Sequence, residues 1–209
     1  SAAMLGGLGS FAGAVAGGLH IIIIPIYNSI FPRFSALAVL HNDQALIKLY
    51  HASTQLMAVL VFPAAVTLAV FSYDIILLWT GNSFISRNTA PLVSILTIGT
   101  AINALMVLPY TLQLAYGWTN ISLKINIFLI VMMVPTIIIL TNHYGPTGAA
   151  SSWVILNATY MVIGIPLTHR RLLKGEVKNW FCDFVYTFAG VLVTVLIGRY
   201  LFNNFIPNI

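Results

Sequence analysis

The stretch Ile121–Thr141 reads ISLKINIFLIVMMVPTIIILT and holds a single charged residue, Lys124. A helix of about 20 apolar residues is long enough to cross the hydrocarbon core of a bilayer. The apolar run is continuous, whereas a transmembrane strand alternates apolar and polar residues. This stretch therefore predicts a membrane-spanning helix.

Comparable apolar runs lie on both sides of this stretch. Together they make six: Leu5–Phe31, Thr54–Trp79, Ala90–Gly117, Ile121–Thr141, Gly148–Thr168 and Phe181–Phe205. The 209 residues are 59% hydrophobic and only 6% charged, against about 25% charged in a soluble domain. We expect an all-α integral membrane protein of about six transmembrane helices, as one polytopic domain over residues 1–209 without a soluble domain.

The basic residues predict an orientation. When the connections are assigned alternately to two sides, one side receives Arg33, Lys48, Lys124, Arg170, Arg171, Lys174 and Lys178, and the other only Arg87 and Arg199. Basic residues are enriched in cytoplasmic loops. The connections after the first, third and fifth helices should therefore be cytoplasmic. Four tryptophans near predicted helix ends suit the headgroup region: Trp79, Trp118, Trp153 and Trp180.

Two connections have a recognisable pattern. Residues 32–53 mix polar and apolar side chains, which predicts a turn at Pro32 and then an interfacial helix that runs into the second span. Residues 142–148 contain Gly and Pro together and predict a short turn.

Prolines inside five predicted spans favour bent helices, although proline is also common in membrane helices: Pro25, Pro63, Pro109, Pro135 and Pro166.

Polar residues form stripes on three predicted helices. The third run carries Gly99, Asn103, Met106, Tyr110, Gln113 and Gly117 on one face, the fifth carries Trp153, Asn157, Tyr160 and Gly164, and the first carries Gly9, Gly13, Gly17, His20, Tyr27 and Asn28. An unpaired polar group is costly in hydrocarbon, so such faces should point toward other helices or a wet cavity. Hydrogen bonds that only hold the bundle together, and a substrate cavity, both remain open interpretations.

The sequence contains no pattern typical of an enzyme. We find no paired carboxylates at catalytic spacing and no catalytic or phosphate-binding motif, and we expect no cofactor and no metal. The four acidic residues fall in predicted loops or near helix ends, so ion coupling through this part of the protein is not expected: Asp43, Asp74, Glu176 and Asp183. The basic residues are scattered, which argues against nucleic-acid binding.

Five segments resemble a known family when they are taken in order. They are Ile30–Leu37 with Phe-Pro-x-x-Ser, Asp43–Tyr50 ending in Leu-Tyr, Ile76–Gly81 ending in Leu-Trp-x-Gly, Pro109–Gly117 with Pro-Tyr-x-x-Gln-x-Ala-x-Gly, and Tyr144–Ala150 with Tyr-Gly-x-x-Gly-Ala-Ala. This order is similar to that of polysaccharide flippases, the Wzx-type O-antigen transporters of the MATE-like MOP superfamily. Each motif alone is weak, and the resemblance covers the chain up to about His169.

The resemblance implies a two-lobed transporter of which this chain forms most of the C-terminal lobe, without the N-terminal lobe and truncated at both ends. It implies that the parent protein moves a lipid-linked oligosaccharide, carried on polyprenyl pyrophosphate, across a bacterial inner membrane. The partners would be this substrate, membrane lipids and the N-terminal lobe. Arg33 is the candidate pyrophosphate contact, or equally a membrane anchor. The candidate sugar-facing positions are His20, Tyr27, Asn28, Asn103, Tyr110 and Gln113.

Three alternatives remain. A multidrug or cation exporter of the same superfamily would share the architecture, but such exporters usually use buried carboxylates. A non-transporting component of glycan assembly, such as a polymerase, should carry large outer loops, whereas the predicted loops are short. The third alternative is a scaffold protein that binds no substrate. The prolines and the polar stripes argue only weakly against it.

Overall fold

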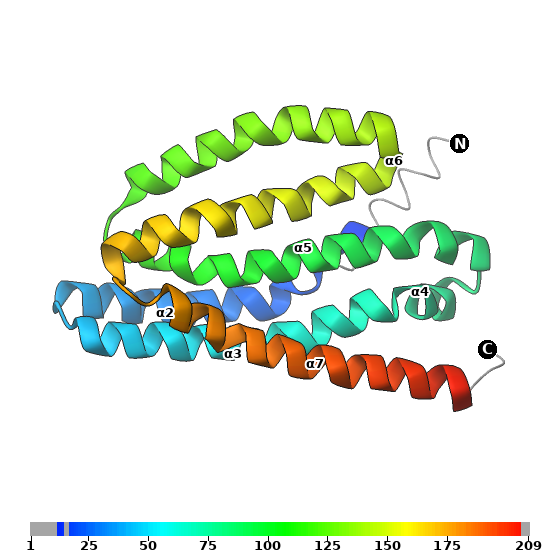
Figure 1. Ribbon diagram of the computed structural model, residues 1–209, viewed down its shortest axis with the longest axis horizontal. Helices are drawn as coiled ribbons and strands as arrows, with labels where there is room; N and C mark the ends of the chain where they lie inside the picture. Colours follow the sequence, from blue (N-terminus) through cyan, green and yellow to red (C-terminus); the bar gives the residue numbers. More distant parts are fainter. Residues whose placement is uncertain (1–11, 15–16, 206–209) are drawn as a thin grey trace.

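The computed structural model describes residues 12–14 and 17–205, and all regular elements in this part are helices (Figure 1). They are α2 (His20–Val39), α3 (Asp43–Val70), α4 (Ser72–Thr80), α5 (Ser83–Ala115), α6 (Thr119–Leu172) and α7 (Val177–Phe205). Five spans are long and apolar enough to cross a membrane: His20–Val39, Asp43–Val70, Ser83–Ala115, Ser122–Leu172 and Val177–Asn204. The prediction of an all-α integral membrane protein is confirmed.

Helix α6 is two antiparallel helices joined at Gly145, as Figure 1 shows. Gly145 has φ 61° and ψ −139°, a conformation that residues with a side chain rarely adopt. A Cβ at Gly148 would overlap the carbonyl oxygen of Leu140, so the reversal also needs a glycine there. The predicted turn at residues 142–148 is confirmed. We call residues 119–144 the first limb and residues 146–172 the second limb.

The second predicted span is wrong in one respect. The run Thr54–Trp79 was expected to be a single helix, but α3 ends at Val70 and α4 starts at Ser72. The break is stabilised from outside, because the Ser94 hydroxyl of α5 donates to the Ala69 carbonyl at 2.8 Å and pairs with the Ser72 hydroxyl at 2.8 Å. These bonds satisfy polar groups that a helix end exposes.

The predicted turn at Pro32 is also wrong. Helix α2 continues through Pro32 to Val39, and the chain turns at residues 40–42, where His41 has φ 50°. The Asn42 side chain then caps α3 by accepting from the Ala45 amide at 3.1 Å, as is usual at helix starts. The predicted continuation into the second span is confirmed. The predicted first span begins in residues 1–11, which lie outside the described residues, and so does Gly9.

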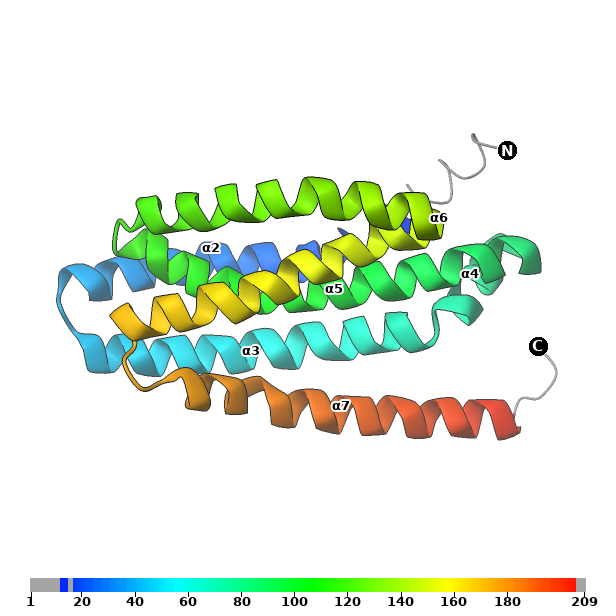
Figure 2. The same cartoon turned by 45° about the horizontal axis from the view of Figure 1, so that its top comes forward.

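Helix α5 is at the centre of the bundle and contacts α2, α3, α4 and α6. The main core holds fully buried side chains from several helices, such as Phe34, Met57, Leu108 and Leu112. In lipid, such helices are held by close packing and hydrogen bonds rather than by burial of apolar surface. Helix α7 lies along α3 on the outside of the bundle (Figure 2).

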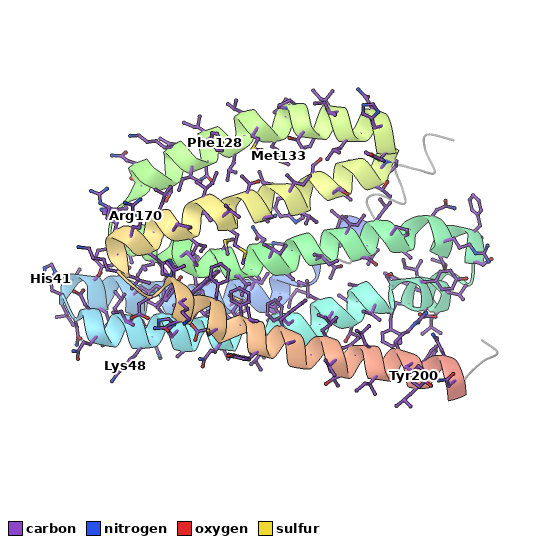
Figure 3. All side chains as sticks on the ribbon, viewed as in Figure 1. His41, Lys48, Phe128, Met133, Arg170 and Tyr200 are labelled. Carbon is purple, nitrogen blue, oxygen red and sulfur yellow. The ribbon has the colours of Figure 1, made fainter. Side chains whose placement is uncertain are left out.

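The connections divide between the two ends of the bundle as predicted. The turns after α2, after α5 and after α6 share one end, where Figure 3 labels His41, Lys48 and Arg170, and Tyr200 lies at the other end. We call the first the basic end. The ring of Trp118 there lies 3.9 Å below the Arg171 guanidinium. Trp180, however, is fully buried, so its expected place among headgroups is wrong.

Candidate functional site

A cavity of about 240 Å³ opens between α5 and both limbs of α6. Its lining consists of amide, phenol and apolar side chains without a charged group: Asn103, Met106, Val107, Tyr110, Asn126, Leu129, Leu156, Asn157 and Tyr160. We call it the amide cavity. A pocket with a few polar groups over an apolar wall is the usual form of a small-ligand site.

Two polar stripes build the cavity because they face each other. A Cβ at Gly99 would overlap the Trp153 ring, so this glycine lets the second limb approach α5 closely. One turn further on, the Asn103 amide donates to the Asn157 side-chain oxygen at 2.8 Å. Asn157 in turn donates to the Trp153 carbonyl at 2.8 Å. These bonds fix both amides at the cavity wall and leave the Asn103 side-chain oxygen directed toward no described donor.

Tyr160 is the second polar feature of the wall. It is buried, and its hydroxyl is enclosed by protein beside the Gln113 side chain, without a hydrogen bond of ordinary geometry among the described residues. Its ring packs 3.2 Å from the position that a Cβ on Gly164 would take, which fixes the ring against its own helix. An unsatisfied buried hydroxyl is costly. Tyr160 therefore belongs to the packing of the wall, and the partly buried Tyr110 is the tyrosine of this lining whose hydroxyl an entering molecule can bond.

The lining selects a chemical class of ligand. Amides and phenols both donate and accept hydrogen bonds, and tyrosine rings offer flat apolar faces. A cation would find no carboxylate in this lining, and an anion would find no lysine or arginine. The cavity therefore suits a neutral group that carries several hydroxyl or amide functions.

Of the predicted site residues, the structure brings Asn103 and Tyr110 together in this cavity. Gln113 lies outside it and is fully buried. Its amide donates to the Thr168 hydroxyl at 2.6 Å, and its oxygen accepts from Ser122. Gln113 therefore joins α5 to both limbs of α6, which corresponds to the bundle-holding interpretation of the stripe.

The predicted residues of α2 lie apart from the amide cavity. The His20 ring is 3.3 Å from the Gly17 carbonyl, Tyr27 stacks on Phe31 with centroids 5.9 Å apart, and Asn28 is exposed. Nothing in the described residues lies within 4 Å of a Cβ placed on Gly13 or Gly17, so no close helix approach occurs there.

Arg33 lines a separate groove of about 220 Å³ between α2 and α3. The groove hydroxyls of Ser29 and Ser53 donate to carbonyls of their own helices at 2.9 and 2.6 Å. Arg33 is exposed and keeps its guanidinium available there. The groove therefore offers one cationic contact beside apolar side chains.

Asn126 of the first limb was missed as a site residue. It lies one helical turn after Ser122, the residue that bonds Gln113, and it faces the cavity. The spacing of four between these two polar residues, in a strongly apolar run, could have shown the stripe.

Comparisons with known proteins support a transport role. The chain is 27% identical over 143 residues to a Shigella flexneri protein named "Putative O-antigen transporter". The match covers 67% of this chain and 33% of that protein, so the chain spans about a third of the length of the curated relative it matches. No family model matches the chain, and no solved structure does. The relative's name agrees with a transporter rather than an enzyme, and the chain is a multi-pass membrane protein with distant similarity to this transporter.

Proposed function

We propose that the protein belongs to a transporter that moves a lipid-linked oligosaccharide across the bacterial inner membrane, and that the amide cavity receives part of the glycan. The uncharged, amide-rich lining carries the proposal, because hydroxyl-rich sugars can exchange bonds with water for bonds with amides and phenols. The name of the Shigella flexneri relative supports the same substrate class. No covalent bond changes in this process.

The pyrophosphate of such a substrate needs a cationic contact, and we assign this role to Arg33. A guanidinium can hold two phosphate oxygens at once. The groove around Arg33 is lined mainly by apolar side chains such as Ile30 and Leu56. Such a lining is compatible with the first carbons of a lipid tail. In this proposal the chain forms most of a C-terminal lobe, and an N-terminal lobe closes the path and rocks against it.

Deletion of the gene in its native host tests the proposal. Lipid-linked oligosaccharides should accumulate on the cytoplasmic side of the inner membrane while surface glycan falls. Unchanged lipid-linked glycans together with lower drug tolerance would instead identify a drug exporter and remove the glycan assignment.

Complementation with point variants then tests the cavity. Tyr110→Phe removes only a cavity-lining hydroxyl for which the structure describes no partner, so the protein should stay as stable as wild type. Glycan transport should fall by about fivefold, as expected for the loss of one hydrogen bond of about 1 kcal/mol. Tyr186→Phe is the matched control, because Tyr186 is 77% exposed on α7. Equal transport by both variants would rule out a direct role of the Tyr110 hydroxyl.

Arg33 is tested in the same assay. Arg33→Ala should reduce transport more than Arg33→Lys, because lysine keeps the positive charge and loses only the bidentate hydrogen bonding to phosphate. Lys48→Ala, another exposed basic residue near the same end, is the control for a general loss of positive charge. If Lys48→Ala reduces transport as much as Arg33→Ala, Arg33 acts as an anchor.

A further inference from the structure

His51 on α3 lies between two carboxylates that come from the other side of a helix interface. Its Nε2 is 3.1 Å from a Glu176 carboxylate oxygen, and its Nδ1 contacts the Asp183 carboxylate. An ionised carboxylate can only accept hydrogen bonds. Both ring nitrogens must therefore donate, which requires a second proton on the ring and a positive charge.

Both carboxylates are held in place by neutral amides. Gln55 donates to the second Asp183 oxygen at 3.0 Å, and Asn179 donates to Glu176 at 2.7 Å. The Asn179 hydrogen bond, with a contribution from His51, lowers the pKa of Glu176. The Asp183 side chain is only 10% exposed. Asp183 lies inside α7 and packs toward α3, further from the helix end than the sequence predicted.

The other groups around His51 do not replace these partners. His169, from the second limb of α6, interacts with it electrostatically and is fully buried. The Nδ1 of His169 lies 2.9 Å from the Ile165 carbonyl, and its Nε2 has no described partner, as in a neutral ring. Tyr50 contacts the His51 ring edge to face, with centroids 5.7 Å apart. Lys48 and Lys178 are exposed.

Among the described contacts of α7 with the rest of the bundle, this cluster is compared with two others. In the middle, Phe62 packs against Phe188 with ring centroids 5.3 Å apart, beside an apolar cavity of about 360 Å³. Near the far end, Arg199 pairs with Asp74 of α4. Arginine stays charged throughout the physiological pH range, whereas histidine changes its charge there. The attachment at His51 is therefore the pH-sensitive one among these three.

We propose that His51, Glu176 and Asp183 form a proton-binding site whose bound proton fastens the first turns of α7 to α3. Loss of the proton leaves a ring nitrogen lone pair facing a carboxylate, so one of the two bonds becomes repulsive. The first turns of α7 then separate more readily from α3, while the aromatic contact and the Arg199 pair remain. The site stands on its own geometry and does not depend on the glycan substrate.

Nitrogen NMR of the ring tests the bound proton directly. The intact protein would carry ¹⁵N-labelled histidine in lipid nanodiscs, with the His51 signals assigned by their absence in His51→Gln. At about pH 6, both His51 nitrogens should be protonated and hydrogen-bonded, and at about pH 9 one of them should not. A singly protonated His51 ring at both values would overturn the proposal, and this measurement needs no destabilised variant.

Hydrogen exchange then tests the mechanical consequence. After correction for the chemical exchange rate, protection of amides 178–186 should fall about tenfold or more from pH 6 to pH 9. The pH-dependent fall should vanish in the double variant Glu176→Gln/Asp183→Asn, which removes both carboxylates from His51. It should persist in Asp74→Asn, which breaks the other ion pair of α7 by the same carboxylate-to-amide change. If the double variant keeps the pH-dependent fall, or Asp74→Asn abolishes it, the proton does not fasten α7.

Discussion

The interface between α5 and α6 and the interface between α3 and α7 use polar groups in opposite ways. The first joins its helices by neutral bonds, Asn103 to Asn157 and Gln113 to Thr168. The second has an ion pair at His51 and a cluster of phenylalanines, and a further ion pair, between Arg199 and Asp74, joins α7 to α4 beyond them.

The difference follows from the cost of each group in hydrocarbon. A neutral amide pair loses little when it is removed from water, whereas an ion pair loses much more and is better placed near a membrane surface. The neutral interface between α5 and α6 can therefore lie deep in the hydrocarbon core, and its hydrogen bonds do not change with pH. The charged interface can be changed by one proton, and it attaches the helix that is most external to the bundle.

The largest effect is expected inside α6, which forms one side of the neutral interface, where its two limbs approach each other closely. In Gly148→Ala, the added Cβ would overlap the Leu140 carbonyl, so the two limbs of α6 cannot keep their packing. We expect a loss of unfolding free energy above about 3 kcal/mol, measured as thermal unfolding in micelles. Gly190→Ala on α7 is the control, because a Cβ there meets nothing within 4 Å. Equal stability of the two variants would show that the close approach at Gly148 does not stabilise the fold.

A smaller loss is expected from cutting the amide pair itself. Asn157→Leu leaves the Asn103 amide donor unsatisfied, which should cost about 1–3 kcal/mol at any pH. The double variant Asn103→Leu/Asn157→Leu removes both partners and should recover part of the loss. Strictly additive losses in this double-mutant cycle would mean that the two amides do not interact.

The neutral interface was largely predictable from the sequence. The stripes that contain Asn103 and Asn157 were visible from their spacing of three and four, and a polar face in hydrocarbon must find a partner. The spacing could not decide which stripe residues line a cavity and which hold the bundle together. Gln113 and Tyr110 belong to the same face, yet Gln113 is sealed by Ser122 and Thr168.

The charged interface was not predictable. His51 and Asp183 are 132 residues apart, and no local pattern indicates that α7 returns to lie on α3. Burial of Trp180 also depends on a distant helix, because its ring packs on His169 of α6 with centroids 6.0 Å apart. The break after Val70 likewise depends on a Ser94 hydroxyl from another helix. These features are set by contacts between helices rather than by the sequence of one helix.

Removing one carboxylate at each end of α7 separates the two kinds of ion pair. Asp183→Asn should lower the unfolding free energy by about 1–2 kcal/mol at about pH 6, where His51 then loses one of its two charged partners, and by less at about pH 9. Asp74→Asn should have a similar effect at both pH values, because Arg199 does not titrate. Thermal unfolding of both variants across this range measures the difference. Parallel pH profiles would show that the two ends of α7 are held in the same way.

The smallest effect concerns Glu176 at acidic pH. Its pKa in the folded protein is lowered, first by the Asn179 hydrogen bond and then by His51. A lowered pKa stabilises the fold above the unfolded value, near 4.5, and this contribution is lost as the pH falls through the folded value. Because Glu176 is partly exposed, the contribution should stay below about 1 kcal/mol. Glu176→Gln should therefore flatten the unfolding profile only below about pH 5, and Asn179→Ala should give part of the same flattening by removing the main cause. A profile that Glu176→Gln leaves unchanged there would show that Glu176 does not contribute to the stability of this interface.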